Sequence, residues 1–315
     1  MTSDASRRSF TSTGQLIKLF LSDAEFRNTK ERLENLNYYS GREYLDFIVT
    51  RYEVTSRKIN TPFTCVLISD LHNKCYGEDN GTILDRVREE SPDIILCAGD
   101  LIVGQPDSPF KTAVKLAKGL TLIAPVYFAN GNHETEYRRY AKPKYAAFVS
   151  KMRHAGVHVL NNRSQDTEIC GNKIRVTGLE VSLEKYIKFR KPDCSLEYLE
   201  HKIGPCTSEN DPYTILIAHN PEFLDVYRQW KADLTVSGHY HGGVVRDPFF
   251  GRALLSPYGY VFPKFGVGKR TLSDEHFIIA SAGLGDHTIP LRIFNPREIV
   301  TIKVKPLTDD NRTEA

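Results

Sequence analysis

Short runs of apolar residues recur along the chain, and each of them ends in polar or charged side chains. Five runs show this pattern: 62–70 (PFTCVLISD), 93–100 (DIILCAGD), 124–134 (APVYFANGNHE), 213–219 (YTILIAH) and 233–241 (DLTVSGHYH). Continuous apolar runs of this length, bounded by turn residues, are typical of strands that are buried on both faces. We therefore predict five buried strands whose carboxyl ends carry polar residues.

Helical patterns separate these runs. The pattern over 80–92 places Ile83, Leu84 and Val87 on one helical face and ends at Pro92. Further helices are predicted at 110–118, at 144–156 and directly after Pro221. Strands that alternate with helices indicate βαβ crossovers and parallel strand pairing.

Other segments predict additional strands. Residues 46–59 alternate between apolar and polar, and Gly171-Asn172 has the chemistry of a hairpin turn between 167–170 and 173–180. Apolar runs at 276–285 and 298–304 follow later in the chain. The hairpin and the late strands predict an α/β fold with a mixed sheet or with a second sheet.

The chain is long enough for one large domain. It has 315 residues, of which 40% are hydrophobic and 26% charged, as in an ordinary soluble globular protein. No internal repeat is visible. We predict that 51–306 form the domain, that 1–50 form a polar, partly helical N-terminal extension, and that 307–315 form a disordered tail.

The net charge of the chain limits the classes of binding partner that we expect. The formal net charge is +3 and no long run of Lys or Arg occurs, so the sequence indicates no clear nucleic-acid patch. No segment approaches the roughly 20 apolar residues that a membrane-spanning helix needs.

The sequence favours a cytoplasmic location. The six cysteines are scattered without a CxxC pair, and Cys65 and Cys97 fall in apolar runs, which is typical of reduced, buried thiols. The alternative is export or membrane association, because SRRSF (6–10) resembles the start of a twin-arginine signal. Lys18 interrupts the apolar segment that should follow such a signal.

The polar residues at the strand ends share the chemistry of metal ligands. In open α/β sheets, ligands collect at the carboxyl ends of the strands, so we expect these side chains to lie at one rim. They are Asp70, His72, Asp100, Asn132, His133, His219, His239 and His241.

This set is too large for one tetrahedral zinc ion, whereas a two-metal site accounts for it. One aspartate can bridge both ions, and the imidazoles favour Zn, Mn or Fe over Mg or Ca. In an extended chain, residues two apart point the same way. We therefore expect Asp70 and His72 to share one metal.

The blocks DLH, GD, GNHE, AH and GHYH, in this order, resemble the calcineurin-like metallophosphoesterase superfamily, whose pattern is DxH, GD, GNHD/E, H and GHxH. The resemblance spans about residues 60–305. Five segments are similar in sequence to the YkuE-type bacterial branch: ISDLHN, PDIILCAGDLI, SGHYHGG, FPKFGVG and RIFNPREIV. The resemblance implies an αββα sandwich, with two mixed β-sheets flanked by helices.

It also implies hydrolysis of a phosphomonoester, phosphodiester or pyrophosphate, with in-line attack by a hydroxide that bridges two divalent metal ions (Mn, Zn or Fe). By position, one ion would be held by Asp70, His72, Asp100 and His241. The other would be held by Asp100, Asn132, His219 and His239. Asp100 would be the bridge, and His133 would protonate the leaving oxygen.

Further residues receive supporting roles. We expect Glu134 to orient a ligand and Gly242 to let the backbone approach the ions. The loop 247–270, rich in aromatic residues, Gly and Pro, is either a packed irregular loop or a substrate wall. As a wall it would suit a lipid-linked leaving group. Lys264, Lys269 and Arg270 would then meet substrate phosphate or make peripheral contact with an anionic membrane.

The remaining histidines outside the strand-end pattern are expected to be structural. They are His154, His158, His201, His276 and His287. Two alternative functions stay open: a catalytically silent metal-site scaffold for a protein partner, and a nuclease. A silent scaffold typically lacks a ligand or the acid histidine, and a nuclease needs a basic groove.

Overall fold

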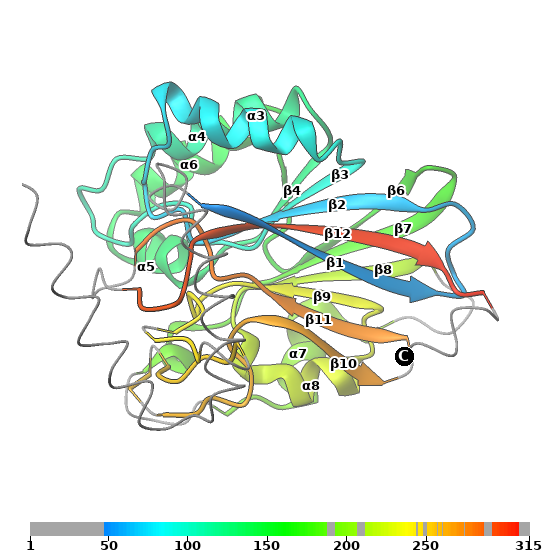
Figure 1. Ribbon diagram of the computed structural model, residues 1–315. Coiled ribbons are helices and arrows are strands. Elements are labelled where there is room, and N and C mark those ends of the chain that lie inside the picture. The colour runs from blue at the N-terminus through cyan, green and yellow to red at the C-terminus, as the bar shows by residue number, and fades with distance from the viewer. Residues whose placement is uncertain are drawn as a thin grey trace, which may run out of the picture. The chain divides into compact units, whose positions relative to one another are not determined.

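Two six-stranded sheets lie face to face at the centre of the protein, with helices on both outer sides (Figure 1). The computed structural model describes residues 47–187, 193–206, 212–243, 245–247, 251–256, 258–259, 261–273, 275–286 and 292–308.

The first sheet is mixed. Its strands are, in spatial order, β1 (Ile48–Ser56), β12 (Glu298–Pro306), β2 (Phe63–Ile68), β3 (Ile94–Cys97), β4 (Val126–Phe128) and β5 (His158–Val159). β2 to β5 pair in parallel. β12 runs antiparallel to β2 and parallel to β1, so this late strand lies between β2 and the earliest described strand, which forms the edge of the sheet.

The second sheet is also mixed. Its strands are, in spatial order, β10 (Gly268–Ser273), β11 (His276–Ala280), β9 (Leu234–Ser237), β8 (Tyr213–Ala218), β7 (Asn172–Leu179) and β6 (Arg163–Ile169). The four central strands are parallel, and the two edge strands pair antiparallel with their neighbours.

Helices follow most of the parallel strands. The α-helices and short 3-10 helices (η) of the described residues are η2 (Glu78–Asn80), α3 (Gly81–Glu89), α4 (Lys111–Thr121), α5 (Asn132–Tyr140), α6 (Lys142–His154), η3 (Leu183–Tyr186), α7 (Leu196–Ile203), η4 (Pro221–Phe223) and α8 (Leu224–Trp230). Figure 1 shows α3, α4 and α6 over the first sheet and α7 and α8 over the second.

Successive side chains of each strand point to opposite faces of its sheet, and this alternation divides the core into three layers. In β2, Val66 and Ile68 belong to the cluster shared with α3, α4 and α6, whereas Cys65 and Leu67 face the cluster between the sheets. A third cluster packs the second sheet against α7 and α8. Both faces of each central strand are therefore buried, which explains why these strands read as continuous apolar runs.

The expected αββα sandwich is confirmed, including the second sheet and the helix that begins at Pro221. Two helices, α5 and α7, were not expected from the sequence. The segment 124–134, expected as one strand with polar residues at its end, becomes β4, a short loop and the start of α5.

The predicted extension of 1–50 and the tail of 307–315 lie almost entirely outside the described residues. Among the residues that are described, no helix combines the length and the hydrophobicity that crossing a bilayer requires.

The two sheets approach each other closely where β7 passes the end of β5. A Cβ atom at Gly178 would overlap the backbone carbonyl of Leu160. We predict that Gly178→Ala lowers the free energy of unfolding by about 1–3 kcal/mol, because a buried backbone must move to accept the methyl group. Urea denaturation measures this loss.

Gly81→Ala is the matched control, because open space surrounds the position and its φ of −50° is helical. There the substitution should leave stability unchanged or raise it by about 0.5–1 kcal/mol. Equal stability of the two variants would contradict the close approach of the sheets.

Candidate metal centre

The loop after β2 leaves the strand by a left-handed turn. Asp70 has φ 51° and His72 has φ 48°. The extended geometry expected for this pair is therefore wrong, although both side chains still point into one cluster. The backbone N–H groups of Asp70 and His72 donate to the carbonyls of Gly99 and Asp100, at 3.0 Å each, which joins this loop to the one after β3.

Left-handed backbone is concentrated among the predicted ligands. Five of the seven have a positive φ: Asp70, His72, Asp100, His239 and His241. Such conformations are uncommon for residues other than glycine and cost free energy, so they persist where the surrounding structure enforces them. Their concentration at the strand ends is typical of a functional site.

Glu134 holds two of the strand-end loops together. Its buried carboxylate accepts hydrogen bonds from the backbone N–H groups of Asp100 (2.8 Å), Gly131 (2.9 Å) and Ile102 (3.2 Å). Since Gly131 precedes α5, the same carboxylate caps the first turn of that helix. Glu134 therefore fixes Asp100 relative to the start of α5.

One group of potential ligands consists of Asp70, His72 and His241. The Nε2 atoms of His72 and His241 lie 3.1 Å apart and their rings stack, with centroids separated by 5.0 Å. Nε2 of His241 is 3.4 Å from Oδ1 of Asp70. These are distances at which a single cation could contact all three side chains.

A second group consists of Asp100, His219 and His239, all of them buried. Nε2 of His219 lies 3.0 Å from Oδ2 of Asp100, while its Nδ1 contacts the Ala98 carbonyl at 2.6 Å. The carbonyl requires a proton on Nδ1, which turns Nε2 toward Asp100. Because Oδ2 of Asp100 is also 4.0 Å from Nε2 of His72, Asp100 lies between the two groups.

Asn132 is the first residue of α5 and is buried. Its Oδ1 atom has no hydrogen-bond partner among the described residues. A buried amide oxygen without a partner costs free energy, so it indicates a ligand for that oxygen. Together with carboxylate and imidazole groups, it forms the mixed oxygen and nitrogen donor set that suits Mn, Fe or Zn.

His133 projects at the edge of the cluster and is partly exposed. The backbone N–H of Gly104 donates to its Nδ1 at 2.9 Å. In the neutral ring, the proton must then reside on Nε2. That Nε2 lies 3.9 Å from Oδ2 of Asp100, and the ring meets His72 edge-on with centroids 4.7 Å apart.

Burial and charge act in opposite directions on the pKa values of the site. Burial raises the pKa of Asp70 to about 6, and burial followed by the charge of Asp100 raises that of Glu134 to about 7. Burial also acts to raise the pKa of Asp100, but His219 and His133 hold it well below its usual range. For His219, burial acts to lower the pKa, yet the charges of Asp100 and Asp70 raise it to about 9.

Two residues that support His241 were not found from the sequence. Asn295 donates to the backbone carbonyl of His241 at 2.6 Å. Arg292 is largely buried and donates to the carbonyls of Ala282 (2.8 Å) and Gly285 (2.6 Å) beside Nδ1 of His241. Both contacts use backbone carbonyls, which no side-chain pattern reveals.

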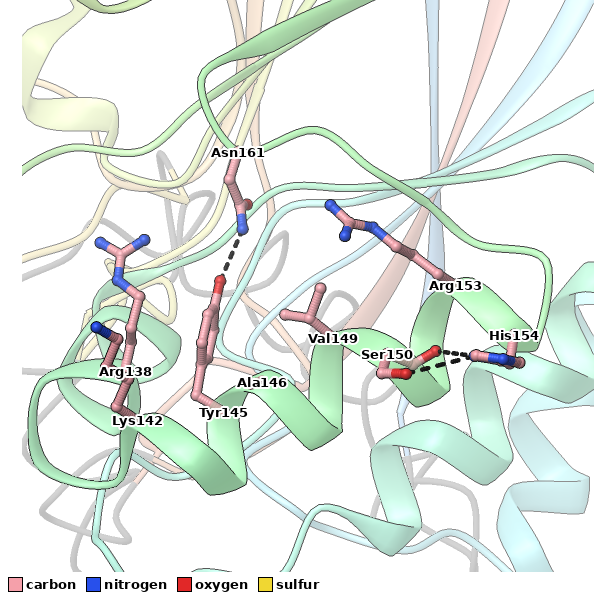
Figure 2. A pocket seen from close by; sticks show the side chains of 9 residues that line it. All are labelled: Arg138, Lys142, Tyr145, Ala146, Val149, Ser150, Arg153, His154 and Asn161. Atoms are coloured by element: carbon pink, nitrogen blue, oxygen red, sulfur yellow. Dashed lines mark hydrogen bonds between the residues drawn. The ribbon is translucent and has the colours of Figure 1, made fainter.

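A polar network holds Asn130, which lies two residues before Asn132. The Nδ2 atom of Asn130 donates to the Tyr145 hydroxyl at 2.8 Å and to Glu180 at 2.7 Å. Asn161 also donates to the Tyr145 hydroxyl, at 2.8 Å (Figure 2). The end of β4 is therefore fixed from α6 as well as from Glu134.

The ammonium group of Lys264 pairs with Asp225 on α8 at 2.7 Å, and its contact with substrate stays a prediction. Gly242 has φ 69°, and a Cβ atom there would overlap Oδ1 of Asn295. Within the loop 247–270, the buried Tyr258 ring packs on His239 with centroids 5.5 Å apart. His287 lies outside the described residues.

The family model for calcineurin-like phosphoesterases matches residues 63–243, which include all seven predicted ligands. The chain belongs to this family. It is a hydrolase that acts on phosphoester bonds, and its His and Asp clusters agree with a dinuclear divalent metal site.

Relatives of this phosphoesterase include the metallophosphoesterase YkuE of Bacillus subtilis, 28% identical over 77% of this chain and 79% of its own length. The phosphodiesterase YaeI of Escherichia coli is 26% identical over 76% of this chain and 82% of its own length. A 5′-nucleotidase precursor of Thermus thermophilus shares 16% identity over 78% of this chain with a TM-score of 0.46, and this chain spans 54% of it.

We predict that Glu134→Gln weakens metal binding by about 10–100-fold, the usual effect of losing a group that positions ligands. The amide offers one acceptor oxygen where three N–H groups converge, so the loops of Asp100 and Gly131 should separate. Metal content of the purified protein, measured by mass spectrometry against free metal concentration, reports the change.

Glu136→Gln serves as control, because this neighbouring carboxylate is 39% exposed and holds none of the three N–H groups. It should retain the metal affinity of the natural chain. If Glu134→Gln binds metal as tightly as this control, the positioning role is wrong.

Proposed function

We propose that this phosphoesterase works with two divalent ions, one held by each group of ligands around Asp100. The first ion would be held by Asp70, His72, Asp100 and His241. The second would be held by Asp100, Asn132, His219 and His239. The observation that carries this proposal is the position of Asp100, whose Oδ2 atom lies 3.0 Å from His219 and 4.0 Å from His72.

The donor set fits two ions better than one. Seven ligands exceed the four of a tetrahedral site, and two carboxylates offset part of the charge of two dications. When bound, two such ions would activate water and polarise the phosphoryl group. The chain's own residues then have to orient the ester and deliver a proton to the leaving oxygen.

His133 is suited to that proton transfer. The N–H of Gly104 occupies its Nδ1 and leaves the proton on Nε2, which is the nitrogen on the Asp100 side of the ring. An Nε2–H group held there can hydrogen-bond to an oxygen that leaves beside Asp100, and full proton transfer requires the imidazolium form, in which Nδ1 is protonated as well. Its partial exposure, 28% for the side chain, gives the leaving group a path to solvent.

The substrate class follows from the surroundings of His239. Tyr186, which is partly exposed, packs edge-on against its ring with centroids 5.0 Å apart and forms an aromatic wall on this side of the centre. Tyr258 also packs on the ring, with centroids 5.5 Å apart, but it is buried and supports the wall without facing a substrate. We propose that the wall receives the organic part of a phosphodiester, either a small molecule or a lipid-linked one. The name of the Escherichia coli relative, a phosphodiesterase, supports a diester.

We predict that His241→Ala and His239→Ala each remove one ion, but from different halves of the centre. Each variant should bind about one metal per chain instead of two, because each loses a ligand of a different ion. Metal stoichiometry measures the loss. With one Mn²⁺ retained, the two variants should differ in their electron paramagnetic resonance spectra because the remaining ligands differ.

A single ion lost from the same half in both variants would contradict the division of ligands. Retention of two ions in both would contradict the assignment of these histidines. His276→Ala, which changes a histidine on β11 whose Nδ1 contacts the carbonyl of Ala232, is the control and should retain two.

We predict that His133→Ala lowers kcat for nitrophenyl phosphodiesters by about 10²–10⁴-fold, the usual contribution of a positioned acid. Metal content should stay unchanged, because His133 belongs to neither proposed ligand set. The loss should be smaller for esters whose leaving groups are more acidic, since these need less protonation.

The same substrates, together with a nitrophenyl monoester and a nucleotide-linked lipid, identify the preferred ester. His201→Ala, an exposed histidine on α7, is the control and should keep full turnover. Unchanged turnover in His133→Ala, or a loss that is independent of the leaving group, would show that His133 is not the acid.

A further inference from the structure

Positive charge is concentrated in one segment of the chain. Between Glu136 and Asp166 there is no acidic residue, although the whole chain has a formal net charge of only +3. The cations of this segment are Arg138, Arg139, Lys142, Lys144, Lys151, Arg153 and Arg163. Most of them lie on the end of α5 and on α6. The remainder of the chain is therefore net acidic.

A groove of about 490 Å³ runs along α6 within this segment (Figure 2). None of the residues that line it is acidic: Arg138, Lys142, Tyr145, Ala146, Val149, Ser150, Arg153, His154 and Asn161. In Figure 2, Arg138 and Lys142 lie on one side of Val149, and Arg153 and His154 lie on the other. Cations thus occupy both ends of the groove, with Ala146 and Val149 between them.

The cations of this segment differ in whether their side chains have a protein partner. Lys144 pairs with Asp107 at 2.9 Å, and Arg139 stacks on Tyr140. By contrast, no hydrogen bond or ion pair to the described residues is found for the side chains of Lys142 and Arg153, nor for that of Lys151, which lies outside the groove. Two side-chain charges without a protein partner therefore lie at the groove.

We propose that this groove binds a small molecule that carries two or more phosphate groups. Lys142 and Arg153 are separated by eleven residues, about 16 Å along a helix, a distance that their flexible side chains can shorten around one ligand. Arginine and lysine are the usual partners of phosphate oxygens. The site shares no residue with the two proposed ligand sets, so it does not depend on the proposed function.

The shape of the groove favours a small molecule over a macromolecule. Its volume falls within the range of roughly 300–1,000 Å³ that is usual for small-molecule sites. Arg138 is already held by Glu180 at 3.0 Å, which leaves two unpartnered cations at the groove, fewer than a nucleic-acid backbone usually engages. The apolar Ala146 and Val149 would contact the organic part of the ligand.

The test is calorimetric titration of the metal-loaded, full-length chain with inorganic tripolyphosphate at about 150 mM salt, where long-range charge effects are screened. Lys142→Ala combined with Arg153→Ala should weaken binding at the groove at least tenfold, or about 1.4 kcal/mol. Both side chains are exposed, so the variant should fold normally.

The matched control combines Lys144→Ala with Lys151→Ala, which removes the same charge from the same helix outside the groove. It should bind tripolyphosphate within twofold of the natural chain. Any binding at the metal centre is common to all three proteins. Turnover of a nitrophenyl diester should be equal in all three, which keeps this test separate from that of the proposed function.

Equal weakening in both double variants would overturn the proposal, because it would show a general effect of charge. The same titrations use a single-stranded oligonucleotide and phosphatidylglycerol vesicles. The proposal would also be overturned if either of these bound the natural chain more tightly than tripolyphosphate and bound Lys142→Ala/Arg153→Ala more weakly than the natural chain. That result would indicate a macromolecular partner. The proposal is supported if tripolyphosphate binding weakens in Lys142→Ala/Arg153→Ala alone, and the oligonucleotide and the vesicles show no such loss.

Discussion

The carboxylate of Glu134 is the constraint on which the candidate centre depends. A buried carboxylate is costly unless hydrogen bonds compensate it, and here three backbone N–H groups do so. Two of those groups belong to the loop after β3 and one precedes α5. One side chain thus fixes Asp100, which lies between the two ligand groups, relative to Asn132 and His133. The positions of the ligands follow from a residue that is not itself proposed as a ligand.

Close approach of backbone to carboxylate explains the glycines of the motifs. A Cβ atom at Gly131 would overlap the carboxylate of Asp100, and one at Gly238 would overlap that of Asp70. The N–H of His133 reaches Oδ1 of Asp100 at 2.8 Å, and that of His239 reaches Oδ1 of Asp70 at 3.0 Å. Each aspartate is therefore oriented by the backbone of a neighbouring strand end, and this contact requires a residue without a side chain one or two positions before the donor.

The sequence predicted the fold and the gathering of polar residues because both depend on strands buried on two faces. It did not predict α5, since NHETEYRRY is strongly polar and the helix is fixed by the capping carboxylate of Glu134 and by the burial of Tyr137. Nor did it predict Arg292 and Asn295, which act on backbone carbonyls. The sequence also could not show that the ammonium group of Lys264 pairs with Asp225, because the fold decides which carboxylate lies near a surface lysine.

The charges around Asp100 make protons and cations competitors for the same atoms. The charges of Asp100 and Asp70 raise the pKa of His219, which favours a proton on its Nε2. A divalent ion needs the lone pair of that nitrogen and must displace the proton. The carbonyl of Ala98 occupies Nδ1, so the proton that leaves is the one on Nε2, facing Asp100. The carboxylates that attract the ion therefore also strengthen the binding of the proton that competes with it.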